Sequence, residues 1–239
     1  MSDFFEELDY CPTPIGALSL RRRRDLRLDS EVFEIMLGRE YLMTSAFTAS
    51  EVALGRLGIA ACKGRALQVV VGGLGLGYTA DAVLGQDRVA DLTVVEFLVP
   101  VIEWHARGIL PLGTKLTEDP RCHLVQGDFF AMAAGAGFDA GAPGRQFDAI
   151  LADIDHAPDH LLDARSDSFY RPDGLRALAR HLKPGGIFGL WSDKLTDPRF
   201  LDRLGAAFAE AWAEPVTFDN PLTDKPFTQT VYLARTATP

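Results

Sequence analysis

The sequence predicts an α/β fold of the Rossmann-like kind, with a mostly parallel sheet and helices on both of its faces. Two observations carry this prediction. Short apolar runs alternate with helical patterns through most of the chain, and wholly apolar strands are typical of a sheet covered on both faces. The first of these runs leads into a glycine-rich turn, Gly72-Gly73-Leu74-Gly75-Leu76-Gly77, which opens a helix.

The first 50 residues depart from this pattern. Residues 17–20 and 31–37 have strand character with turn residues between them, and they predict a small β appendage of two or three strands. We therefore expect the appendage at residues 1–50 and a Rossmann-like domain at residues 51–239. The basic run Arg21-Arg22-Arg23-Arg24 is interpreted as a solvated edge strand, with contact to an anion or a partner as the alternative.

From Thr48 onward, helix and strand signals alternate. Thr48 and Glu51 have the spacing of a capping box, which predicts the start of a helix. Five apolar runs and two closing runs then predict a seven-stranded sheet whose last two strands are antiparallel. The expected strands are residues 67–71, 92–96, 122–125, 147–153, 187–191, 216–218 and 228–233. The expected helices span residues 78–84, 99–110, 169–182 and 198–213, with a turn at 183–186.

Composition narrows the class of protein. The chain has 239 residues, of which 47% are hydrophobic and 24% charged, as in ordinary globular proteins. Its formal net charge of −9 argues against nucleic acid as a partner, since a nucleic-acid-binding face is normally basic. The three cysteines have no metal-binding spacing, and no apolar run approaches the length of a membrane span. The N-terminus lacks a signal-peptide pattern. We expect a cytoplasmic protein with no metal and no membrane partner.

The turns that follow the strands carry candidate binding residues. Ligands of parallel sheets bind beyond the carboxyl ends of the strands, so these turns should share one cleft. Glu96 ends the second strand, where a carboxylate can accept hydrogen bonds from ribose hydroxyls. Glycines allow a sharp turn and close approach of a ligand to the backbone; those expected to do so are Gly72, Gly73, Gly75 and Gly77. A tight turn without a ligand is the alternative for the glycines, and a helix N-terminal acid for Glu96.

Two further strand ends add polar candidates. Asp128 follows the third strand and could accept a hydrogen bond from an adenine amino group, with Phe129 or Phe130 packing on the ring. Capping of the next helix is the alternative, and Asp128 could also do both. Asp153, Asp155 and His156 follow the fourth strand, where two acids and a histidine suggest proton handling or capture of an amine. Turn and capping chemistry is the alternative for these three residues.

Together these features resemble the class I S-adenosylmethionine-dependent methyltransferase fold and, more narrowly, the spermidine synthase (polyamine aminopropyltransferase) family. The resemblance covers roughly residues 67–191. It rests on the glycine-rich turn, Glu96, Gly127-Asp128, the strand that ends at Asp153, and Leu182-Lys183-Pro184-Gly185-Gly186. It implies an S-adenosylmethionine or decarboxylated S-adenosylmethionine co-substrate, a small amine or polyamine acceptor and a homodimer.

The resemblance also implies roles for single residues. Glu96 would hold the ribose, Asp128 the adenine, and Asp153 would assist deprotonation of the attacking amine. The sequence departs from the family pattern at Gly75, where family members usually carry an Asp that holds the aminopropyl amine, and at His156, where a second Asp is usual. The family's Tyr-His-Glu is reduced to Ala49-Ser50-Glu51.

Four functions therefore stay open at the level of sequence. The first is aminopropyl transfer from an S-adenosyl sulfonium to an amine, and the second is methyl transfer to a small molecule, which Gly75 favours. An NAD-binding oxidoreductase is the third, because the glycine-rich turn and Glu96 also suit a dinucleotide. A non-catalytic nucleoside-binding protein is the fourth.

Overall fold

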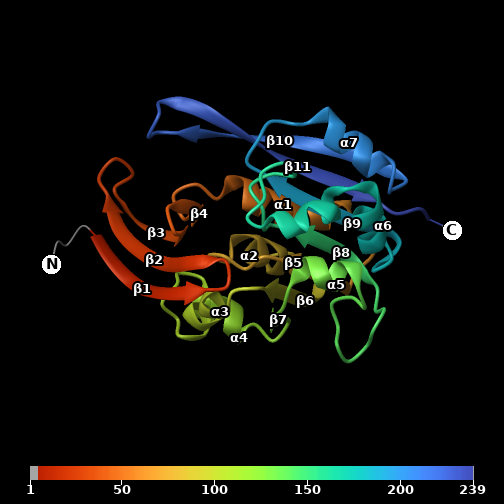
Figure 1. The fold of residues 1–239 in the computed structure, drawn as a ribbon, viewed down its shortest axis with the longest axis horizontal. Helices are drawn as coiled ribbons and strands as arrows, with labels where there is room; N and C mark the ends of the chain where they lie inside the picture. Colours follow the sequence, from red (N-terminus) through yellow and green to blue (C-terminus); the bar gives the residue numbers. More distant parts are fainter. Residues whose placement is uncertain (1–4, 239) are drawn as a thin grey trace.

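A computed structural model describes residues 5–238. These residues form two β-sheets, seven α-helices and one 3₁₀ helix (Figure 1). The N-terminal part is a four-stranded antiparallel sheet whose strands follow one another in chain order. Its strands are β1 (Phe5–Thr13), β2 (Gly16–Asp25), β3 (Ser30–Leu37) and β4 (Glu40–Thr44). The expectation of two or three strands was therefore wrong. β1 was missed because none of its side chains is fully buried, so it shows no alternation of apolar and polar residues.

The sequence suggested that the arginine run forms an edge strand, and this expectation was wrong. It lies in β2, an inner strand paired with both β1 and β3, and each guanidinium faces an acid on this sheet. Arg22 contacts Glu6 at 2.6 Å, and Arg23 bridges Asp25 and Glu34 at 2.6 and 2.8 Å. Acids of the neighbouring strands, of β2 itself and of the β2–β3 turn therefore neutralise the basic cluster within the appendage.

The larger sheet has seven strands in the order β10-β11-β9-β8-β5-β6-β7, which confirms the predicted architecture. The strands β9, β8, β5, β6 and β7 are parallel to one another. β11 pairs antiparallel with β9, and β10 pairs antiparallel with β11. The strands are β5 (Leu67–Gly72), β6 (Val89–Glu96), β7 (Cys122–Gln126), β8 (Phe147–Ala152), β9 (Leu182–Ser192), β10 (Glu210–Asn220) and β11 (Lys225–Arg235).

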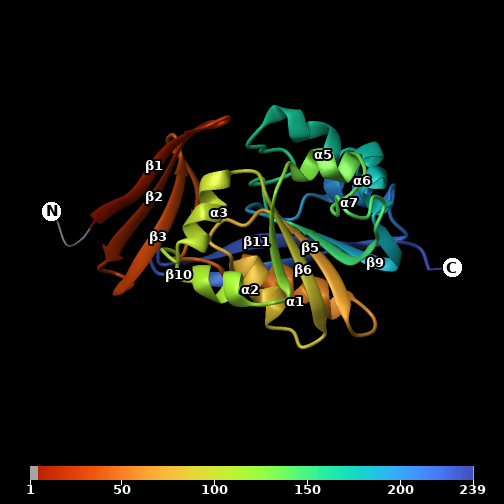
Figure 2. The ribbon, with the colours of Figure 1, turned by 90° about the horizontal axis from the view of Figure 1, so that it is seen from below.

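Helices cover both faces of this sheet (Figure 2). Alternate residues of β5 enter different cores, since Val69 and Val71 belong to one buried cluster and Val70 to the other. The first core is covered by α1 (Ala49–Ala61), α2 (Tyr78–Leu84), α3 (Val99–Ala106) and α4 (Gly113–Glu118). The second is covered by α5 (Phe129–Ala134), α6 (Pro172–Ala179), α7 (Pro198–Gly205) and the 3₁₀ helix η1 (Ala164–Tyr170).

Several element boundaries differ from the sequence expectations. The helix expected to reach residue 213 ends at Gly205, because residues 210–213 pair with β11 and join β10. The helix expected at 169–182 is split into η1 and α6, and α4 and α5 were missed. The expected turn at 183–186 lies inside β9, where the register with β8 shifts and the extra residues bulge out.

The appendage packs against the first core through α3. Leu18, Leu20 and Ile35 share a buried cluster with Val101 and Trp104, so the two sheets are continuous in packing. The indole N–H of Trp104 also donates to Asp9 Oδ2 at 2.7 Å. This docking fixes one face of the appendage over the carboxyl ends of the parallel strands.

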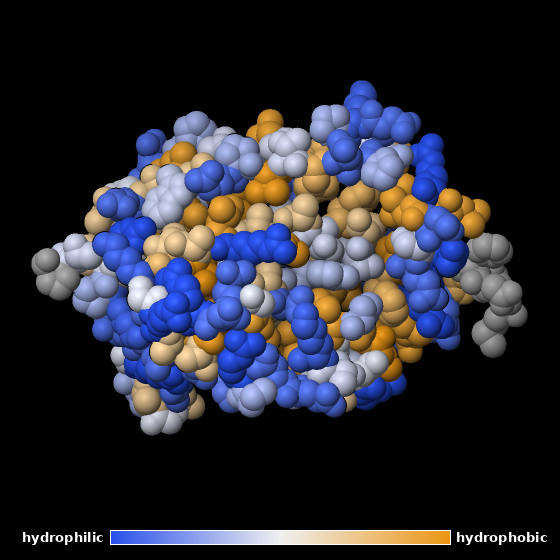
Figure 3. Space-filling model, turned by 180° about the vertical axis from the view of Figure 1, so that it is seen from behind, coloured by the Kyte–Doolittle hydropathy of each residue, from blue (hydrophilic) through white to orange (hydrophobic). Residues whose placement is uncertain are grey.

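Hydrophilic side chains cover much of the face in Figure 3, with smaller hydrophobic groups between them. Within residues 5–238, seven large hydrophobic side chains are exposed, and four of them belong to the appendage or its β2–β3 turn: Phe5, Tyr10, Leu26 and Tyr41. A homodimer formed through the appendage stays a prediction. Among residues 5–238, no helix combines the length and apolar character that crossing a membrane requires.

Candidate active site

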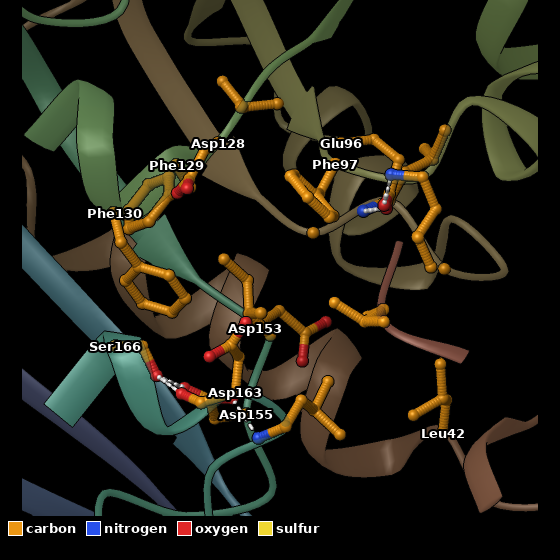
Figure 4. Close-up of a pocket in the computed structure, with 18 of the residues that line it drawn as sticks. Leu42, Glu96, Phe97, Asp128, Phe129, Phe130, Asp153, Asp155, Asp163 and Ser166 are labelled. Carbon is orange, nitrogen blue, oxygen red and sulfur yellow. Dashed lines mark hydrogen bonds between the residues drawn. The ribbon is translucent and has the colours of Figure 1, made fainter. Parts of the chain in front are cut away.

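A cavity of about 370 Å³ lies where the parallel strands end beneath the appendage (Figure 4). Its size is within the range of small-molecule sites. The turns after β5, β6, β7 and β8 all contribute to its wall, which confirms that these strand ends share one cleft. The segment 162–168, α1, α3, α5, Trp191 of β9 and three strands or turns of the appendage complete the lining.

The glycine-rich turn needs glycine for two physical reasons. Gly73, Gly75 and Gly77 have φ angles of +88°, +48° and +93°, in the left-handed region that side chains disfavour. At Gly73 a Cβ atom would also lie 2.1 Å from the carbonyl oxygen of Asp153. The turn and the loop after β8 are therefore in direct backbone contact, and the Asp153 N–H donates to the Gly72 carbonyl at 2.8 Å.

A histidine beneath the turn supports it. His105 Nε2 lies 2.9 Å from the carbonyl oxygen of Gly75, and burial lowers the pKa of the imidazole. A neutral ring can donate this hydrogen bond from Nε2. Sequence reasoning assigned no role to His105, because nothing in the local pattern shows that α3 passes under the turn.

Glu96 lies at the end of β6 and lines the cavity. Its carboxylate accepts hydrogen bonds from the backbone N–H groups of Leu74 and Leu98, at 2.9 and 2.8 Å. Burial raises the pKa of Glu96, while these backbone hydrogen bonds oppose the rise. The side chain therefore ties the glycine-rich turn to the loop after β6, and its remaining lone pairs are available to a ligand.

The loop after β7 carries the next predicted residues. Asp128 lines the cavity and also caps α5, since its carboxylate accepts from Ala131 N–H at 3.0 Å. The two readings of this residue are thus compatible. Phe129 is only 2% exposed, and its ring packs on Gly72, so little of it faces the cavity. Phe130 is less buried and offers the more accessible aromatic face (Figure 4).

A pair of carboxylates, Asp153 and Glu51, occupies the centre of the site. Asp153 comes from the loop after β8 and accepts a hydrogen bond from Thr79 Oγ1 at 2.6 Å. Glu51 comes from the first turn of α1, and its Oε2 lies 2.7 Å from Ser50 Oγ. Burial and repulsion from Asp153 raise the pKa of Glu51 to about 7. Burial raises the pKa of Asp153 to about 6.

Glu51 was not among the candidate residues from the sequence, which interpreted it as part of a capping box. That interpretation is wrong, because the side chain of Thr48 makes no capping hydrogen bond. Glu51 is instead buried against the cavity, where Ser50 also accepts a hydrogen bond from the indole of Trp191 at 2.8 Å. The sequence did contain one signal for this residue. Glu51 matches the Glu of the Tyr-His-Glu motif with which Ala49-Ser50-Glu51 was compared.

The raised pKa of Glu51 predicts a stability change with pH. Between about pH 4.5 and 7 the folded protein retains a proton that the unfolded chain has lost, so the free energy of unfolding falls as pH rises. Glu51→Gln removes this dependence. We expect the variant to gain at least about 1 kcal/mol over the wild type between pH 4.5 and 8, since one pKa unit is about 1.4 kcal/mol. Urea unfolding at pH 4.5 and pH 8 measures the free energy of unfolding of each protein. Glu118→Gln is the control, because Glu118 is exposed. Parallel curves for wild type and Glu51→Gln would contradict the assignment.

The other two residues after β8 are placed differently. Asp155 is buried, and its carboxylate accepts from Leu162 N–H, Ser166 Oγ and Tyr170 OH at 2.7, 3.1 and 2.7 Å. It lines the cavity but mainly holds the segment 162–170 in place. His156 is not among the residues that line the cavity. Its Nε2 lies 3.3 Å from Glu40 of the appendage, and its ring lies against His160.

The appendage places a sulfur atom where a side chain at position 75 would lie. A Cβ at Gly75 would lie 2.9 Å from Met43 Sδ, and the Leu76 N–H lies 3.2 Å from the same sulfur. Met43 therefore lies directly over the glycine-rich turn. Sequence reasoning could identify the missing acid at Gly75 but not the residue that takes its space.

Comparison with known proteins defines the fold. No protein-family model matches the chain. The crystal structure of spermidine synthase from Thermotoga maritima is similar with a TM-score of 0.70 and 18% identity, over 98% of this chain and 73% of that one. A spermidine synthase in complex with the transition-state analogue AdoDATO is similar with a TM-score of 0.73 and 18% identity, over 98% and 74%. The chain thus has the fold of spermidine synthases, as its sequence predicted.

Proposed function

We propose that this protein is an alkyltransferase that moves an aminopropyl group from an S-adenosyl sulfonium donor to an amine. The observation that carries the proposal is the Glu51–Asp153 carboxylate pair, placed in one cavity with the glycine-rich turn and Glu96. Carboxylates in a partly desolvated cavity attract a cationic amine and can accept its proton. The likeness to a spermidine synthase bound to a transition-state analogue supports the same chemistry.

The residues around the turn suit the nucleoside part of the donor. Glu96 offers carboxylate oxygens to the ribose hydroxyls while its backbone partners keep it oriented. Asp128 offers an acceptor to the adenine amino group, and Phe130 offers an aromatic face beside it. The positions of Gly73 and Gly75 let the donor pass close to the backbone of the turn.

The reaction is a displacement at carbon. The lone pair of the amine nitrogen attacks the methylene carbon next to the sulfonium, so a C–N bond forms while the C–S bond breaks. The electron pair of the broken bond goes to sulfur, which leaves as the neutral thioether methylthioadenosine. Asp153 accepts the proton that the nitrogen loses and passes it to solvent. The protein contributes alignment of the reactants and an unprotonated nucleophile.

Methyl transfer is the second candidate, and the structure at Gly75 favours it. With Met43 in place of a carboxylate, no acid at this point holds the amino group of a decarboxylated donor or repels the carboxylate of S-adenosylmethionine. The two reactions differ in the donor that is consumed and in the nucleoside that is released.

A transfer assay tests the proposal. The protein is incubated at pH 8 with a panel of small amines and with each donor in turn, and products are identified by mass spectrometry. Aminopropylated amine and methylthioadenosine in equal amounts are the expected products. Methylated amine with S-adenosylhomocysteine would replace the first candidate by the second. No transfer from either donor to any amine would overturn the proposal.

Glu96→Gln tests the nucleoside site separately. The amide keeps the shape of the side chain but loses the charge that strengthens hydrogen bonds to ribose hydroxyls and to Leu74 N–H. We expect the dissociation constant of methylthioadenosine to rise at least about tenfold, since hydrogen bonds to charged groups contribute about 1.5–3 kcal/mol. Calorimetry measures it, and thermal unfolding of the variant checks that the fold is intact. An unchanged affinity would remove Glu96 from the ligand site.

A further inference from the structure

One wall of the cavity is entirely apolar, and the appendage builds most of it. The appendage residues that line the cavity, among those the structure describes, carry no charge. They are Ile15, Ile35, Leu42 and Met43. Leu74, Leu98 and Val101 of the larger domain also line the cavity and belong to the same buried cluster as Ile35, against which Leu42 and Met43 pack. Figure 4 shows Leu42 on the side of Asp153 away from Phe129 and Phe130.

This apolar wall is part of the packed core and is therefore fixed in place. Ile35, Leu98 and Val101 are only 1%, 7% and 2% exposed, and all three belong to the core cluster shared by the two sheets. Met43 is held by its contact with the Leu76 N–H. The residues of this wall have no polar side chain that could hydrogen-bond a substrate group placed here.

The acids of the cavity leave few places for positive charge. Glu96 is bonded to two backbone N–H groups, Asp155 is fully engaged by the segment 162–170, and Asp163 pairs with Arg165 at 2.6 Å. Asp128 lies with the aromatic residues on the nucleoside side. Asp153 and Glu51 remain, and each has only a hydroxyl as its side-chain partner.

We infer that the acceptor is a primary monoamine with an apolar tail. This inference rests on the proposed function. Two carboxylates match two amino groups, that of the donor's aminopropyl chain and the one that attacks. The tail of the acceptor then lies on Ile15, Ile35, Leu42 and Met43. A diamine would bring a third cation, and its distal ammonium would lose water against hydrocarbon with no partner, which is strongly unfavourable.

Two amines of equal length test this inference on the unmodified protein. In n-pentylamine a methyl group stands where 1,4-diaminobutane has its second ammonium. At pH 8 we expect kcat/KM for pentylamine to be at least about tenfold higher. Equal or better use of the diamine overturns the inference and leaves the proposed transferase standing. Failure to alkylate any amine overturns both.

A charge placed on the wall should reverse the preference. Leu42→Asp supplies a partner for a distal ammonium, and Leu42→Asn has the same shape without the charge. We expect Leu42→Asp alone to move the pentylamine-to-diaminobutane ratio of kcat/KM at least about tenfold toward the diamine. Equal shifts in the two variants would contradict a charge effect. The comparison of substrates on the wild type does not depend on either variant folding.

Discussion

Asp153→Asn should abolish transfer while leaving the nucleoside site nearly intact. Asparagine keeps the volume of the side chain and can still accept from Thr79, but it cannot take a proton from the attacking amine. Loss of a positioned general base typically costs 10² to 10⁴ in rate, so we expect kcat to fall at least about 100-fold. The dissociation constant of methylthioadenosine should change less than about threefold, because Asp153 is not among the residues proposed to hold ribose or adenine.

The matched control is Asp163→Asn. Asp163 also lines the cavity, but its carboxylate is paired with Arg165 and caps η1. Asparagine retains capping ability, so kcat should stay within about threefold of wild type. If Asp153→Asn weakens nucleoside binding as much as turnover, its role is structural. If kcat is unchanged, the general base lies elsewhere.

Gly73→Ala should have the largest effect on stability of any single methyl group added to the site. Its Cβ would lie 2.1 Å from the carbonyl oxygen of Asp153, and the backbone φ is +88°. Strain at such a φ costs about 1–3 kcal/mol, and relief of the overlap requires the loop after β8 to move. We expect a loss of at least about 3 kcal/mol and a fall in activity, because Asp153 moves with its backbone.

Gly64→Ala separates strain from overlap. Gly64 has a similar φ of +82°, but an added Cβ there meets no atom within 4 Å. Its loss should be about 1 kcal/mol, from strain alone. Urea unfolding of both variants measures the difference. Equal losses would mean that the contact between the glycine-rich turn and the loop after β8 is not tight.

The sheet could be predicted from the sequence because each inner strand is encoded locally. Runs such as residues 69–71 and 149–152 are apolar without interruption, as burial on both faces requires. Elements that depend on a distant partner were predicted less well. Residues 210–213 have helical character but form a strand because β11 is beside them, and β1 is a strand because β2 pairs with it.

The same distinction holds for the candidate site: residues at strand ends could be predicted, and residues that depend on distant packing could not. Glu96, Asp128 and Asp153 follow predicted strands directly, so the topology of a parallel sheet places them in one cleft. Glu51 and Met43 reach the cavity only because α1 and the appendage pack over the strand ends, and no local pattern encodes that packing. His156 follows the same strand as Asp153, but its loop turns it toward Glu40 and away from the cavity.

Calorimetry of nucleoside binding tests the central proposal most directly. The ligands are methylthioadenosine, S-adenosylmethionine, its decarboxylated form and NAD. We expect methylthioadenosine and at least one donor to bind with dissociation constants below about 1 mM, which corresponds to a binding free energy of roughly −4 kcal/mol. NAD should bind more weakly. Tighter binding of the decarboxylated donor supports aminopropyl transfer. If no S-adenosyl ligand binds below about 1 mM, or if NAD binds most tightly, the proposed function is wrong.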